Sequence, residues 1–108
     1  MVPKEAEEQK VFVEWLKVHN YKCAHIPNGG KFPIQYRAKL KKLGVSPGVP
    51  DMMIIHPKGL VFIEMKRQKG GVVSEDQKGW INVLSEISNV QVFVARGADE
   101  AIKIISDL

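Results

Sequence analysis

The chain has 108 residues, of which 44% are hydrophobic and 26% are charged, with a formal net charge of +4. This length suits one domain over residues 1–108, and such a domain buries roughly two-thirds of its unfolded surface. The composition excludes a disordered or collagen-like chain, and no apolar run approaches the ~20 residues of a membrane helix. The N-terminus lacks the apolar core of a signal peptide, and a single cysteine, Cys23, excludes an internal disulfide and a thiolate zinc site. We therefore expect a cytoplasmic protein with no membrane partner.

The predicted elements follow from hydrophobic periodicity and turn residues. In chain order they are a helix over 4–19, a short strand over 21–26, a helix over 33–43, strands over 51–55 and 60–66, a helix over 74–87, a strand over 90–94 and a helix over 98–107. The two central strands are joined by four residues, a spacing typical of a hairpin. This order predicts an α/β fold with a small mixed sheet flanked by helices.

The helix over 74–87 has the clearest local signals. Ser74 and Gln77 fit a Ser-x-x-Gln capping box, and apolar residues follow at helical spacing. Trp80 lies on this apolar face, as Trp15 does on the first helix, and both are expected in the core.

Basic residues dominate one segment of the chain. From Trp15 to Pro50 the sequence contains no Asp or Glu. A stretch of one sign suggests an anionic partner, and the phosphate backbone of a nucleic acid is the commonest one. The alternative is a solvated helix face. The candidate DNA-binding residues lie where Lys and Arg are most frequent within this segment: Arg37, Lys39, Lys41 and Lys42.

Two carboxylates and an amine converge on the central strands. Asp51 opens one strand, and Glu64 and Lys66 lie on one face at the end of the other, because side chains alternate along a strand. Antiparallel pairing would bring Asp51 close to Glu64. A divalent cation would resolve the repulsion between them, and all-oxygen ligation suits Mg²⁺ or Mn²⁺. Lys66 could then activate water or stabilise a phosphate transition state; alternatively, the Glu64–Lys66 face is simply solvated.

These residues carry a resemblance to a known family. Pro50-Asp51, then twelve residues, then Glu64-Met65-Lys66 resembles the PD-(D/E)XK nuclease superfamily. Four segments together resemble the VRR-NUC (virus-type replication-repair nuclease) domain from about residue 5 to 97: Asn28-Gly29-Gly30, residues 44–51, residues 62–66 and Ser74-x-x-Gln77. The resemblance implies a restriction-endonuclease-like core and metal-dependent cleavage of DNA phosphodiesters. A chain this short resembles the stand-alone phage and bacterial members, which are associated with four-way (Holliday) junction cleavage as homodimers.

The resemblance assigns roles to several residues. Asp51, Glu64 and the backbone carbonyl of Met65 would hold the metal, and Lys66 would be the catalytic lysine. Gln77 would support the site, and a capping role is an equal and compatible alternative.

The family also carries a glutamate on the first helix, four residues before a glutamine. Glu5 before Gln9 fits this spacing, and Glu8 is a rival because it shares a face with apolar residues. Complementation of the helix dipole explains either glutamate without a site. The histidines, His19, His25 and His56, lack metal-ligand spacing.

The leading hypothesis is a metal-dependent, structure-specific DNA endonuclease that resolves four-way junctions. Alternatives are a flap, single-strand-specific or nicking nuclease, and a non-catalytic DNA-binding module of the same fold. The complete set of Asp51, Glu64 and Lys66 favours an enzyme. Cutting two strands symmetrically needs two active sites, so we expect a homodimer. Its interface would use either the terminal helix, with Ile102 and Ile105, or the loop around residues 32–34.

Overall fold

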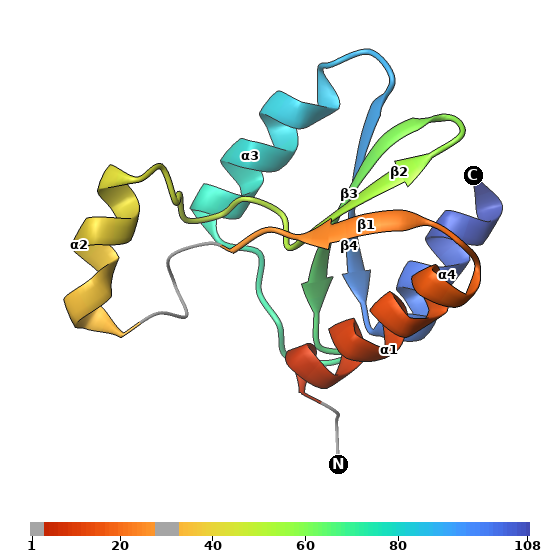
Figure 1. Ribbon diagram of the computed structural model, residues 1–108, viewed down its shortest axis with the longest axis horizontal. Coiled ribbons are helices and arrows are strands. Elements are labelled where there is room, and N and C mark those ends of the chain that lie inside the picture. Colours follow the sequence, from red (N-terminus) through yellow and green to blue (C-terminus); the bar gives the residue numbers. More distant parts are fainter. Residues whose placement is uncertain (1–3, 28–32) are drawn as a thin grey trace.

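The computed structural model describes residues 4–27 and 33–108. Its elements are α1 (Glu5–Val18), β1 (Lys22–His25), α2 (Ile34–Lys42), β2 (Met52–His56), β3 (Gly59–Lys66), α3 (Glu75–Ser85), β4 (Val90–Arg96) and α4 (Ala98–Asp107) (Figure 1). The predicted order is confirmed, and element ends shift by one or two residues. The Asn28-Gly29-Gly30 turn and Phe32 of the predicted interface loop lie outside the described residues. None of the described helices is long and apolar enough to cross a membrane.

The strands of the described residues form one mixed sheet in the order β1-β2-β3-β4. β1–β2 and β2–β3 are antiparallel, whereas β3 and β4 are parallel and connected through α3. The β2–β3 register pairs Met52 with Ile63. Asp51 precedes Met52 and Glu64 follows Ile63, so the hairpin brings these two carboxylates to the same end of the sheet.

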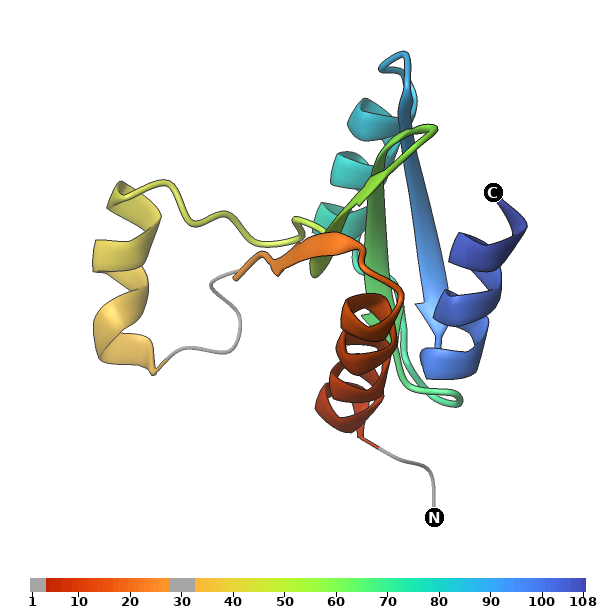
Figure 2. The ribbon, with the colours of Figure 1, turned by 45° about the vertical axis from the view of Figure 1, so that its right-hand side comes forward.

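The hydrophobic core lies between the sheet and a layer made by α1 and α4 (Figure 2). Phe12 and Leu16 of α1 and Ile105 of α4 are buried against Ile63 and Met65 of β3. The side chains of Ile63 and Met65 alternate with those of Glu64 and Lys66. The layer that holds the core therefore also turns Glu64 and Lys66 to the opposite face.

Glu8 connects α1 to the start of α4 through hydrogen bonds. Its buried carboxylate accepts hydrogen bonds from the backbone N–H of Ala98 and, at 3.1 Å, from Gln68 Nε2. Ala98 is the first residue of α4, where backbone N–H groups have no partner within the helix. Gly97 has a φ of 99°, and a Cβ there would lie 2.6 Å from Glu8 Oε2, so only glycine fits beside this carboxylate.

The helices α2 and α3 pack less completely than α1 and α4. Neither contains a fully buried residue, and α2 stands apart from the sheet in both views (Figures 1 and 2). The expected core position of Trp80 is wrong, because its side chain is only half-buried and lies outside the core cluster. Trp15, also half-buried, does pack against that cluster. Helical periodicity identified the apolar face of α3 but not what covers it.

Candidate active site

Asp51 is held at the start of β2 by both neighbouring strands. Its Oδ2 accepts a hydrogen bond from the backbone N–H of Met65 at 3.0 Å. Its backbone carbonyl accepts one from the N–H of Ile26, just after β1, at 2.7 Å. Asp51 and Glu64 are each only 1% exposed, and Lys66 is 7% exposed. The solvated face considered for Glu64 and Lys66 is therefore wrong.

Three carboxylates meet at this end of the sheet. Glu5 of α1, Asp51 and Glu64 each place one oxygen within 4.8 Å of the others. Glu8, the rival of Glu5, is engaged with α4 instead. The structure thus brings Glu5, rather than Glu8, to the predicted pair.

The carboxyl group of Glu64 is electrostatically unusual. Burial, foremost, and the nearby carboxylate of Asp51 raise its pKa to about 8 from an ordinary 4.5, although Lys66 opposes the shift. Its Oε1 is buried and has no hydrogen-bond partner among the described residues. Buried acceptor atoms almost always have a hydrogen-bond partner, so this oxygen needs an explanation. Because two further carboxylates lie beside it, a hard divalent cation bound to all three would explain it. The residues present therefore fit a Mg²⁺ or Mn²⁺ ion.

Lys66 is packed beside the carboxylates. Its Nζ lies 3.7 Å from Glu64 Oε2. A Cβ on Gly71 would lie 3.2 Å from Lys66 Cβ, so the chain after β3 passes tightly over this side chain. Arg96 Nη1 holds that chain by donating to the Gly71 carbonyl at 2.7 Å. Gly71 and Arg96 have no signal in the local sequence, because only the tertiary fold brings β4 to this loop.

Gln77 contacts both the helix cap and the acidic cluster. The capping box is confirmed: Ser74 N–H donates to Gln77 Oε1 at 2.9 Å, and Gln77 N–H donates to Ser74 Oγ at 3.2 Å. Because the cap occupies the amide oxygen, the amide nitrogen is directed to Glu64, where it donates to Oε2 at 3.2 Å. The start of α3 therefore orients a carboxylate of the acidic cluster.

His25 is a neighbour of the site that sequence spacing did not reveal. Its Nδ1 lies 3.0 Å from the backbone carbonyl of Asp51 and 3.1 Å from Nε2 of Gln9. The contact arises because β1 pairs with β2, with His25 opposite Met52. A long-range register of this kind has no signature in the local sequence.

The remaining predicted residues lie elsewhere or stay untested. The basic residues Arg37, Lys39, Lys41 and Lys42 are exposed on α2, which stands apart from the acidic end of the sheet (Figure 1). DNA contact by α2 and metal ligation by the Met65 carbonyl remain predictions.

An α/β fold that gathers carboxylates and a lysine at the ends of two paired strands has the architecture of a restriction-endonuclease-like, DNA-processing nuclease domain. Comparison with known proteins identifies the family within this class. The profile of the VRR-NUC domain matches residues 3–99, and the chain belongs to this family. A solved structure described as a VRR_NUC domain protein is 28% identical with a TM-score of 0.80, and the match covers 97% of this chain and 87% of that one. No curated protein matches the chain.

Proposed function

We propose that this domain is a Mg²⁺- or Mn²⁺-dependent endodeoxyribonuclease that hydrolyses phosphodiester bonds. The observation that carries the proposal is the buried, unpartnered Oε1 of Glu64 within reach of Asp51 and Glu5. A divalent cation bound there would neutralise the carboxylates, attract the scissile phosphate and lower the pKa of an attacking water. The pKa of Glu64 is raised foremost by burial of its carboxyl group and then by the carboxylate of Asp51, and a cation bound there would oppose both effects.

The side chains around the cluster suit this chemistry. Asp51 and Glu64 would hold the cation, with Glu5 and the Met65 carbonyl as further ligands. Lys66, 3.7 Å from Glu64, would stabilise the negative charge that grows on the phosphate in the transition state. A DNA-binding module that lacks catalysis has no need to bury an amine beside paired carboxylates, and this burial favours the enzyme.

Branched DNA is the proposed substrate, and two copies are the proposed acting unit. Each copy would supply one active site, which allows paired nicks across a four-way junction. The basic residues of α2 would contact phosphates, which position a protein on DNA without reading its sequence.

Cleavage of labelled four-way junction, flap and linear duplex DNA tests the proposal. We expect cleavage of the junction with Mg²⁺ or Mn²⁺, in paired nicks, and none in EDTA. Asp51→Asn should abolish cleavage, whereas the matched change Asp99→Asn on the exposed side of α4 should not. Full activity in EDTA would contradict metal dependence, and preferred cleavage of flaps would replace the junction as substrate.

A further inference from the structure

The segment that follows β3, residues 67–71, is held at both ends beside the proposed active site. Before its start, the backbone carbonyl of Lys66 accepts a hydrogen bond from the N–H of Gly97 at 2.9 Å. At its end, the carbonyl of Gly71 accepts a hydrogen bond from Arg96 Nη1 at 2.7 Å. Both donors belong to the end of β4 or to the residue after it. We call this segment the 67–71 loop.

The middle of the 67–71 loop is fixed by α1. Gln68 Nε2 donates a hydrogen bond to Glu8 Oε1 at 3.1 Å, and Glu8 is itself buried against the start of α4. A Cβ on Gly97 would lie 2.9 Å from Gln68 Cγ, so the side chain of Gln68 packs closely against the backbone. Three contacts therefore order a short segment whose first four residues are exposed. Such ordering lowers the entropic cost of binding a ligand there.

Two glycines place Arg67 near the buried lysine. Gly70 has a φ of 84°, a conformation that favours glycine, and the chain turns back at this point. Gly71 then lies against Lys66, because a Cβ on Gly71 would be 3.3 Å from Lys66 Cδ. A Cβ on Gly70 would be 3.7 Å from Arg67 Nη2. The guanidinium of Arg67 therefore lies across the loop, one residue away from the contact with Lys66.

The described residues do not neutralise the positive charges of this loop. Arg67 and Lys69 are both exposed, and neither forms an ion pair within the described part of the chain. By contrast, Lys103 on α4 pairs with Asp107 at 2.7 Å. A guanidinium can donate two parallel hydrogen bonds from its planar fork, which matches two oxygens of one phosphate. An ordered arginine without an anionic partner is therefore suited to a phosphate group.

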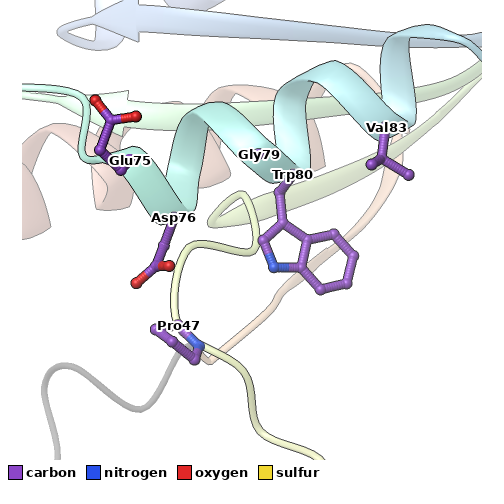
Figure 3. Close-up of a pocket in the computed structure, with 6 residues that line it drawn as sticks. All are labelled: Pro47, Glu75, Asp76, Gly79, Trp80 and Val83. Atoms are coloured by element: carbon purple, nitrogen blue, oxygen red, sulfur yellow. The ribbon is translucent and has the colours of Figure 1, made fainter.

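Another edge of the active site has the reverse charge. The start of α3, where Gln77 orients Glu64, carries Glu75 and Asp76. These two acidic residues line a hollow that also contains Trp80 (Figure 3). A phosphate backbone is repelled by carboxylates and attracted by the 67–71 loop. We therefore expect the phosphates beyond the scissile one to lie on the side of the loop.

We propose that Arg67 binds a DNA phosphate next to the scissile phosphate and so positions the strand at the metal site. Lys69 adds positive charge without a fixed geometry. The inference rests on the proposed nuclease function, and it adds a substrate-positioning residue outside the acidic cluster and outside α2. Because a misplacement of ~1 Å can cost ~10²-fold in rate, loss of this contact should slow the cleavage step as well as weaken binding.

Single-turnover cleavage at saturating DNA separates positioning from binding. Arg67→Gln should lower the saturated rate by ~10²-fold. Arg67→Lys keeps the charge but loses the fork, so it should restore DNA affinity while its rate stays at least ~10-fold below that of the wild type. Lys69→Gln, the matched loss of one charge from the same loop, should weaken binding and leave the saturated rate close to wild type. Equal rates for Arg67→Gln and the wild type, or equal losses in Arg67→Gln and Lys69→Gln, would overturn the proposal.

Binding to labelled junction DNA in Ca²⁺ tests the Arg67 contact independently of cleavage. Fluorescence anisotropy at several salt concentrations should show a slope of log affinity against log salt that falls by ~0.9 in Arg67→Gln and is unchanged in Lys103→Gln. Urea unfolding of Arg67→Gln should match the wild type, because the side chain is exposed. A wild type that binds DNA but cleaves none with Mg²⁺ or Mn²⁺ would overturn the proposed function alone. An unchanged salt slope in Arg67→Gln would overturn the Arg67 contact alone.

Discussion

The two faces of the sheet are covered very differently. On one face, α1 and α4 contribute buried side chains such as Phe12 and Ile105 to a continuous core. On the other face, α3 contributes no fully buried residue, and α2 does not pack on the sheet. The acidic cluster joins the two sides, because Glu5 comes from α1 and the amide that orients Glu64 comes from α3. The α1–α4 face therefore holds most of the core that stabilises the fold, while the face that carries Glu64 and Lys66 is covered less completely by helices.

The sharpest test of this contrast is truncation of one aromatic side chain on each face. Phe12 of α1 is fully buried against the sheet, so Phe12→Ala should lower the free energy of unfolding by ~3–5 kcal/mol. Trp80 on α3 is only half-buried, and Trp80→Ala should cost less than about half as much. Urea unfolding of the two variants at one pH measures the difference. Equal losses would show that α3 shares the core.

A Lys66 variant tests the proposed catalysis. Lys66→Ala should lower the cleavage rate by ~10²–10³-fold, because a buried charge that stabilises the transition state is lost. DNA affinity should change little, since the lysine is one contact among several. Lys78→Ala, on exposed α3, is the matched control for loss of one positive charge. A Lys66→Ala rate close to wild type would reduce the lysine to a structural role.

The two glutamates of α1 should separate stability from metal binding. Glu8→Gln weakens the buried contact with the start of α4 and should cost ~1–3 kcal/mol of unfolding free energy with little effect on Mn²⁺ affinity. Glu5→Gln should do the reverse, weakening Mn²⁺ binding while the unfolding free energy stays close to wild type. Calorimetry measures the Mn²⁺ affinity of each variant, and urea unfolding measures its free energy of unfolding. If Glu8→Gln impairs metal binding more than Glu5→Gln, their assignments must be exchanged.

The pH dependence of stability tests the electrostatics of the cluster. In its metal-free folded form Glu64 has a pKa of about 8, whereas the ordinary value is 4.5. Between these values the folded state retains a proton that the unfolded state has released, so the free energy of unfolding falls as the pH rises. Glu64→Gln should flatten this dependence between pH 5 and pH 8. Urea unfolding in EDTA at several pH values in this range measures the free energy of unfolding of both proteins. The same dependence on pH in the wild type and in Glu64→Gln would contradict the raised pKa.

The smallest expected effect concerns the basic side of α2. Lys41→Gln should weaken all DNA substrates alike and reduce the slope of log affinity against log salt by ~0.9 if one duplex phosphate contact is lost. Lys103→Gln on α4 is the matched control. An unchanged salt slope would identify the basic segment as a solvated face.

Local patterns predicted most of the fold and the proximity of Asp51 to Glu64. Alternation along β3 and the hairpin spacing were enough to place Asp51 beside Glu64, and the capping box was evident in Ser74 and Gln77. The choice between Glu5 and Glu8 was not evident from the sequence. It depends on a contact between Glu8 and Ala98, which lie ninety positions apart in the chain. Such contacts depend on how whole elements pack, which periodicity does not specify.

Direct titration with Mn²⁺ tests the central claim, that paired carboxylates at the ends of β2 and β3 bind a catalytic cation. Calorimetry with the wild-type protein should detect binding that both Asp51→Asn and Glu64→Gln abolish, while circular dichroism shows that the fold is retained. Glu86→Gln, at the exposed end of α3, should bind as the wild type does. Unchanged Mn²⁺ binding in Asp51→Asn and Glu64→Gln would contradict the account.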